Sequence, residues 1–151
     1  MRYFLILLTL TLVNRAANAQ TAEDSVKAVI NDMFNGMRNG DAVLFRSAFS
    51  DSVVMQTIRR NRDRKTVVVN ENFSEFVEFV GKLKKDSADE RITFETIKID
   101  GPLAIAWTPY KFYYNGNFSH CGVNSFQLVR FDGRWKIQYL IDTRRIAGCE
   151  K

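Results

Sequence analysis

The chain has 151 residues, of which 46% are hydrophobic and 26% are charged, close to the average for globular proteins. A chain of this length is expected to fold into a single domain with its own hydrophobic core, without room for a second domain. Its net charge of +5 at pH 7 is too small to indicate a nucleic-acid-binding protein.

The first residues have the pattern of a secretory signal peptide. Arg2 precedes an apolar run over residues 3–13, and small residues stand before a cleavage site between Ala19 and Gln20. The apolar run is shorter than the roughly 20 residues that span a bilayer, so no membrane insertion is expected. We therefore expect a signal peptide over residues 1–19 and a secreted or periplasmic protein.

The mature domain is expected to span residues 20–151. Removal of two arginines with the signal peptide leaves 20 basic and 17 acidic side chains, a net charge of +3. The two cysteines enter a compartment where disulfides persist, and a single histidine in the chain gives no zinc pattern. We expect one disulfide, no metal site and no cofactor.

Apolar residues at three- and four-residue steps predict helices in the first half of the domain. The first runs over Ala22–Arg38 and ends at Asn39-Gly40. Asp41 is placed to cap a second, short helix that includes Phe49. A third helix is predicted over Ser74–Lys84.

Alternating and β-branched patterns predict the strands. Ser52–Ile58 and Thr66–Val69 form a hairpin whose basic tip, residues 59–65, is expected to be solvated. Four later strands form an antiparallel meander with tight turns at Asn115-Gly116 and Asp132-Gly133. These four strands are Arg91–Asp100, Leu103–Tyr114, Phe118–Phe131 and Arg134–Arg144. The fold class is α+β.

This order of elements, with Asn39-Gly40-Asp41, Ala48–Asp51 and the closing Gly133–Ile137, resembles the nuclear transport factor 2-like superfamily over the whole mature chain. His120–Leu128 and Asp142–Arg145 are similar to exported bacterial members grouped as lumazine-binding or SnoaL-like proteins. The resemblance implies a curved sheet wrapped around three helices as a cone, also called a cystatin-like roll. It also implies a pocket at the open end and a homodimer formed through the sheet, but no single function.

The hairpin turns predict which side chains share a face of the sheet, because residues directly opposite each other point to the same side. With two-residue turns, Trp107 lies opposite Asn124 and His120 lies opposite Arg145. The face toward the helices then carries Ile105, Trp107, Phe126, Leu128, Ile137, Tyr139 and Ile141. Thr108 and Asp142 are expected on the other face.

A ligand site is expected where this apolar face carries a few polar groups. The residues expected to bind the ligand are Trp107, His120, Asn124, Tyr139 and Arg145. A bulge at Pro109 or Gly122 would shift the register by one residue and invert the assignment beyond it.

The same register predicts how the cysteines pair. It sets Cys121 opposite Arg144, and the tail after Arg145 is able to turn back at Gly148. We therefore expect a disulfide between Cys121 and Cys149.

His120 is the only candidate for acid–base catalysis, since it alone has an ordinary pKa near neutrality. A hydrogen-bonded structural histidine fits the pattern as well. The ketosteroid isomerases of this superfamily use an aspartate base and an oxyanion hole with a tyrosine. Alignment on Gly40-Asp41 and Phe49 places Met33 at the tyrosine and Thr57 at the base, and neither can transfer that proton.

We therefore expect an exported domain that binds a small, partly apolar molecule and has no evident catalytic set. One alternative is a SnoaL-like enzyme, an isomerase, cyclase or hydrolase that uses His120. Another is a pairing or accessory module without a ligand, in which aromatic side chains fill the inner face.

Overall fold

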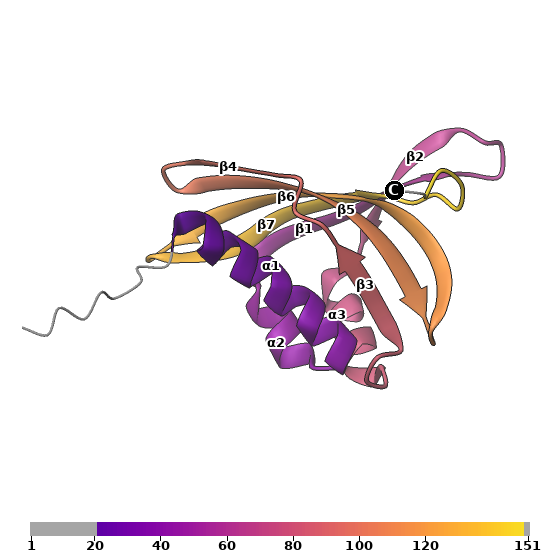
Figure 1. The fold of residues 1–151 in the computed structure, drawn as a ribbon, viewed down its shortest axis with the longest axis horizontal. Coiled ribbons are helices and arrows are strands. Elements are labelled where there is room, and N and C mark those ends of the chain that lie inside the picture. Colours follow the sequence, from indigo (N-terminus) through magenta and orange to yellow (C-terminus); the bar gives the residue numbers. More distant parts are fainter. Residues whose placement is uncertain (1–20, 150–151) are drawn as a thin grey trace, which may run out of the picture.

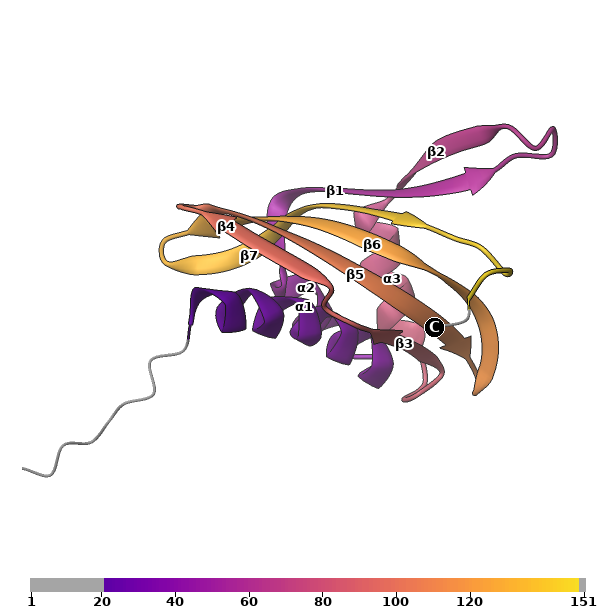
Figure 2. The ribbon, with the colours of Figure 1, turned by 45° about the horizontal axis from the view of Figure 1, so that its top comes forward.

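The computed structural model describes residues 21–149 and shows a curved sheet with helices packed on its concave side (Figure 1). Within these residues the chain forms three helices and seven strands. The sheet curves around the helices, which confirms the expected α+β cone (Figure 2). The signal peptide expected over residues 1–19, and its cleavage site after Ala19, lie outside the described residues.

Each helix is capped by a residue that favours this role. Thr21 accepts a hydrogen bond from the backbone N–H of Asp24, whose carboxylate accepts one from the backbone of Thr21. Gly40 follows the first helix with a φ of 67°, a left-handed conformation that glycine adopts without strain. Asp41 and Asn72 cap the other two helices. The helices are α1 (Ala22–Asn39), α2 (Ala42–Ser47) and α3 (Phe73–Lys82).

The strands are β1 (Phe49–Arg60), β2 (Thr66–Glu71), β3 (Ala88–Ile92), β4 (Thr96–Asp100), β5 (Leu103–Tyr114), β6 (Asn117–Phe131) and β7 (Arg134–Thr143). They pair in the order β2-β1-β7-β6-β5-β3, and β4 pairs with the other half of the β5 edge. β1 and β7 are parallel, whereas the other neighbours are antiparallel. The sheet is therefore mixed.

Two strand boundaries differ from the predicted ones. The sequence pattern assigns Phe49 to the second helix, but β1 begins there. The predicted strand Arg91–Asp100 is two strands, β3 and β4, separated by residues 93–95. Pro109 of β5 lies opposite this gap and has no N–H to donate, so the ladder is interrupted there.

The two long hairpins contain one bulge each. Asn115-Gly116 and Asp132-Gly133 form the predicted tight turns, and all four residues have positive φ. Ser119 is the extra residue between β5 and β6, and Gln138 is the extra residue between β6 and β7. Beyond each bulge the register differs by one position from the predicted register, although neither bulge lies at Pro109 or Gly122.

The shifted register corrects the assignment of side chains to faces. The expected pairs of Trp107 with Asn124 and of His120 with Arg145 are wrong. The residues found opposite are Ser125 for Trp107, Thr108 and Asp142 for Asn124, Phe112 for His120, and Cys121 for Arg145. The residues that move to the convex face are Ile105, Trp107, Tyr139 and Ile141. Thr108 and Asp142 lie instead on the concave face.

The hydrophobic core lies between the concave face and the helices. Phe126 of β6 is fully buried and meets Phe34 of α1 edge to face, with ring centroids 6.3 Å apart. Other fully or almost fully buried members are Val26, Ile30, Phe45, Phe49, Val80, Leu128 and Ile137. The predicted inward positions of Phe126, Leu128 and Ile137 are correct.

The predicted disulfide between Cys121 and Cys149 is present, with Cα atoms 5.7 Å apart. Cys121 lies opposite Arg145 rather than Arg144, and the tail turns back at Gly148, which has a φ of 66°. The bridge closes a span of 28 residues. In the chain-entropy model such a loop stabilises the fold by about 3 to 4 kcal/mol.

β1 and β2 form the predicted hairpin, which extends beyond the rest of the sheet (Figure 2). The connection between them, residues 61–65, is exposed along its whole length. The basic tip is therefore a solvated surface, as its composition predicts.

Candidate functional site

A row of polar side chains crosses the concave face of the sheet. Thr108 on β5, Asn124 on β6, Asp142 on β7 and Thr57 on β1 stand opposite one another in register. Their exposed fractions are 0%, 4%, 9% and 1%. Because a buried polar group is destabilising unless it is hydrogen-bonded, this row requires partners.

Glu90 joins this row from the edge strand β3. It lies opposite Phe112, and Nδ2 of Asn124 donates a hydrogen bond of 2.8 Å to its Oε1. Burial raises the pKa of Glu90 to about 7, and the charge of Asp142 acts in the same direction. The bond from Asn124 and the charge of Arg144 act in the opposite direction. Near neutral pH this carboxyl therefore exists in both its charged and its neutral form.

Asp142 is the centre of a second hydrogen-bonded group. The hydroxyl of Tyr110 donates to Oδ2 of Asp142 at 3.0 Å and lies 2.9 Å from the carbonyl oxygen of Thr143. Nε of Arg144 donates to the same Oδ2 at 2.9 Å. Burial and the negative charges of Asp142 and Glu90 raise the pKa of Tyr110, so its hydroxyl keeps its proton.

Gly122 allows Tyr110 to reach Asp142. It lies directly opposite Tyr110, and a β carbon added to it would stand 1.7 Å from the carbonyl oxygen of Thr143 and 2.8 Å from the hydroxyl of Tyr110. A larger residue would displace one of these groups. The glycine is therefore required by a close approach and not by a bulge.

A cavity of about 70 Å³ lies beside these polar groups. Its apolar wall is formed by Met33, Phe34, Met37, Phe45, Met55, Phe76 and Leu140. Its polar lining is formed by Gln56, Glu71, Glu90, Asn124, Asp142 and Arg144. An apolar cavity with a few convergent polar groups is the usual form of a small-molecule site.

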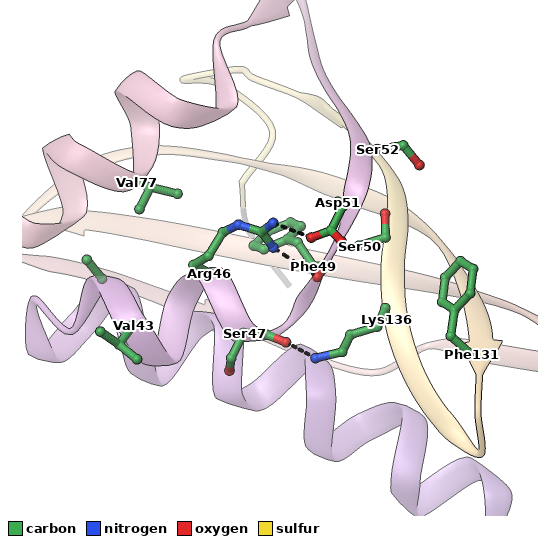
Figure 3. A pocket seen from close by; sticks show the side chains of 11 residues that line it. Val43, Arg46, Ser47, Phe49, Ser50, Asp51, Ser52, Val77, Phe131 and Lys136 are labelled. Atoms are coloured by element: carbon green, nitrogen blue, oxygen red, sulfur yellow. Dashed lines mark hydrogen bonds and ion pairs between the residues drawn. The ribbon is translucent and has the colours of Figure 1, made fainter.

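A larger hollow, of about 880 Å³, lies on the outside between α2, the start of β1 and the β6–β7 turn (Figure 3). It is an open groove whose charged side chains have local partners. Arg46 bonds to Asp51 at 2.6 Å and to the carbonyl oxygen of Phe49, and Lys136 bonds to the carbonyl oxygen of Ser47. Among the described residues that line this groove, Ser50 is the one buried polar residue, and its hydroxyl already donates to Gln138, so we assign the candidate site to the smaller cavity.

Two of the five residues expected to bind the ligand lie on the concave face. Asn124 lines the cavity. His120 is not among the residues that line the cavity; its ring centroid lies 5.7 Å from that of Tyr110, and burial together with the charge of Arg144 lowers its pKa. Its ring nitrogen Nδ1 pairs with the hydroxyl of Ser119 at 3.0 Å. Within residues 21–149, no hydrogen bond joins His120 to a second titratable group.

The other three residues lie on the convex face. Trp107 is 47% exposed. The hydroxyl of Tyr139 donates to Oε1 of Gln56 at 2.6 Å, and Nε of Arg145 bonds to the carbonyl oxygen of Gly148. The structure thus separates them from His120 and Asn124.

Glu90, Tyr110 and Asp142 are site residues that the sequence does not predict. Glu90 stands one residue before the predicted strand, so no face was assigned to it. The face of the sheet on which Tyr110 and Asp142 lie depends on the bulges at Ser119 and Gln138. The signal in the sequence was the segment Asp142–Arg145, which carries part of the family resemblance.

Among residues 21–149, no group of three or more His, Cys, Asp or Glu side chains is arranged to hold a metal ion. No helix in this part of the chain is long and apolar enough to cross a membrane.

Solved structures share the fold. An NTF2-like protein of unknown function from Shewanella baltica OS155 superposes with a TM-score of 0.63 at 15% identity, covering 83% of this chain and 94% of that one. An NTF2-like protein of unknown function from Shewanella oneidensis MR-1 superposes with a TM-score of 0.64 at 13% identity, covering 82% of this chain and 99% of that one. A domain of unknown function with a cystatin-like fold from Nostoc punctiforme PCC 73102 superposes with a TM-score of 0.62 at 15% identity, covering 83% of this chain and 78% of that one.

At these identities the solved structures show the fold alone. No curated protein matches the sequence. The family described as "Putative lumazine-binding" matches residues 21–139, which include Glu90, Tyr110 and Asn124 but not Asp142 or Arg144. The chain therefore belongs to this family, and it has the fold of the NTF2-like proteins named above.

Proposed function

We propose that the protein binds a small, partly apolar molecule in the cavity between the helices and the concave face. The observation that carries this proposal is the buried polar row, in which the hydroxyls of Thr57 and Thr108 have no hydrogen-bond partner among residues 21–149. A buried polar group without a partner is destabilising by about 1 to 3 kcal/mol. Proteins retain such groups chiefly where function uses them.

The cavity must enlarge to hold a ligand of ordinary size. Ligand pockets usually measure about 300 to 1,000 Å³, whereas this cavity measures about 70 Å³. Three methionines, Met33, Met37 and Met55, line it. Methionine side chains are flexible and repack readily, so a bound molecule is able to enlarge the cavity without moving the sheet.

Lumazine is the first probe, because the family description names it. It is a flat bicyclic dione with N–H donors and carbonyl acceptors. Glu90 and Asn124 supply an acceptor oxygen and an amide at one wall of the cavity, and the methionine and phenylalanine side chains supply an apolar wall. This arrangement complements a molecule of that kind.

Native mass spectrometry of small molecules retained by the purified protein tests the proposal, with and without added lumazine. Asn124→Leu removes the amide that bonds Glu90, whereas Gln127→Leu is the matched change on the exposed convex side of the same strand. We expect retention to be lost in Asn124→Leu and kept in Gln127→Leu. Equal retention by both folded variants would exclude the cavity as the binding site.

A SnoaL-like enzyme is a second candidate, and Glu90 favours it more than His120 does. The pKa of Glu90 is raised to about 7, near the optimum for general acid–base catalysis, and Glu90 lines the cavity. An enzyme would convert the retained molecule, and Glu90→Gln would stop the conversion without releasing it. A retained molecule that stays unchanged in the wild-type protein supports the binding function alone.

We also propose that the protein is exported and pairs through the sheet. The convex face exposes Leu103, Ile105 and Trp107 by 47%, 42% and 47%, which favours an interface there. Sedimentation of the wild-type protein and of Trp107→Lys tests the pairing, with a monomeric wild type as the contrary result. An intact mass that begins at Gln20 supports export, and a species that retains Arg15 contradicts it.

A further inference from the structure

The charges around the cavity do not balance. Three carboxyl groups line it, those of Glu71, Glu90 and Asp142, whereas its lining includes a single cationic side chain, that of Arg144. Nε of Arg144 is bound to Asp142, and the Arg144 side chain is 44% exposed. In the described part of the chain the guanidinium is hydrogen-bonded to Asp142 and acts on Glu90 and Glu71 only through its charge, so the lining is net negative when all three carboxyls are ionised.

The polar groups beside the cavity also have free acceptor capacity. In the described part of the chain, Glu90 accepts one hydrogen bond, at Oε1 from Asn124, which leaves Oε2 without a donor. The hydroxyls of Thr57 and Thr108 stand beside Asp142 and Asn124 in the same row, are at least 99% buried, and have no partner there. Carboxylate and hydroxyl oxygens accept hydrogen bonds from N–H donors.

We propose that the ligand of this cavity is a small organic cation, an amine or amidine carried on an apolar body. This inference rests on the proposed function, since it names the chemical class of the ligand for the same site. The ammonium hydrogens bond to the carboxylate of Glu90, which lines the cavity and whose Oε2 has no donor among residues 21–149. The apolar body packs against methionine and phenylalanine side chains, whose rings also attract a cation.

A metal ion fits the carboxyl groups of this cavity less well than an organic cation does. The acidic and histidine side chains of residues 21–149 form no group of three arranged for metal binding. Glu90 and Asp142 come from strands separated by two others, and Asn124 lies between them. A donor-rich organic group is able to bridge this wider arrangement.

The ionisation of Glu90 makes the binding depend on pH. The pKa of Glu90 is about 7 in the empty cavity, and a cation binds better to its charged form, so affinity rises as pH rises through 7. The other titratable or charged groups near Glu90 are Asp142, Arg144, Glu71, Tyr110 and His120. Burial lowers the pKa of His120 and raises that of Tyr110, so both stay neutral between pH 7 and 8.

Three probes of one shape test the inference: isobutylamine, isobutanol and isobutyrate. Binding is measured on the full-length mature protein by titration followed through backbone amide NMR shifts, at pH 8 and pH 5.5. Isobutylamine stays protonated at both values, as a lysine side chain does. We expect the amine to shift the amides of β3 and β6 at pH 8 and to bind about tenfold or more weakly at pH 5.5.

Matched variants locate the effect. Glu90→Gln should weaken amine binding at pH 8 by at least about tenfold, whereas Glu95→Gln changes an exposed glutamate outside the cavity and should leave it unchanged.

Each outcome decides a different claim. If isobutanol, isobutyrate or lumazine binds in the cavity as tightly as the amine or more tightly, the cation inference is overturned and the proposed function stands. An affinity for the amine that is the same in Glu90→Gln and in the wild type also overturns it. If no probe shifts the cavity amides and the purified protein retains no molecule, both proposals fail.

Discussion

The concave face of the sheet has two ends. Inward and outward side chains alternate in the same way along both ends, but the inward side chains differ in chemistry. Toward the β6–β7 turn, Leu128 and Ile137 are fully buried in the core, and Phe126 meets Phe34 edge to face. Farther along the same two strands, Asn124 and Asp142 occupy the equivalent inward positions beside a cavity. The first end stabilises the fold, whereas the second retains polar groups that an apolar core would not need.

Phe126→Ala, at the apolar end, should cause the largest loss of unfolding free energy. It removes a fully buried ring that packs against Phe34, and such changes cost about 3 to 5 kcal/mol of unfolding free energy. Urea unfolding measures it. A loss below about 1 kcal/mol would mean that the apolar end is not the stabilising part of the face.

At the polar end, the contribution of Glu90 to the unfolding free energy should depend on pH. Its pKa is raised from 4.5 to about 7 in the folded protein, so its contribution to stability is fully present below about pH 4.5 and is lost as pH rises through about 7. The expected loss is about 3 kcal/mol. The difference in unfolding free energy between wild type and Glu90→Gln, followed from pH 4.5 to 8, isolates this group. A difference that does not change with pH would place the carboxyl in water.

Thr108→Val should stabilise the protein in the absence of ligand. The hydroxyl is fully buried and has no partner among residues 21–149, and valine keeps its shape. Removal of an unsatisfied hydroxyl should raise the unfolding free energy by about 1 kcal/mol. Ser125→Ala, on the opposite face of β6, is the control. A destabilised Thr108→Val would show that the hydroxyl has a partner, such as an ordered water.

Trp107→Ala should have the smallest effect on folding. Its side chain is 47% exposed on the convex face, away from both ends of the concave face. The expected change in unfolding free energy is about 0.5 kcal/mol or less. It is measured at a protein concentration where sedimentation shows a single species. A loss comparable with that of Phe126→Ala would place Trp107 in the core, as the unshifted register predicts.

The sequence alone determined the order of helices and strands, except that residues 91–100 form parts of two strands and not one. Helix periodicity, the cap at Asp41 and the turns at Asn115-Gly116 and Asp132-Gly133 depend on local preferences, and the structure has each of them. The pairing of Cys121 with Cys149 also followed, because the tail is short and a shift of one residue does not change its reach. The resemblance to the superfamily extended these local patterns to the cone.

Only the tertiary structure decided which residues form the site. The bulges at Ser119 and Gln138 carry no glycine or proline signal, yet each shifts the register by one residue and exchanges the two faces of the sheet. This shift brings Asp142 to the concave face and takes Trp107 to the convex one. Burial then raises the pKa of Glu90, a property that depends on surroundings assembled from distant strands and helices and that no local pattern encodes.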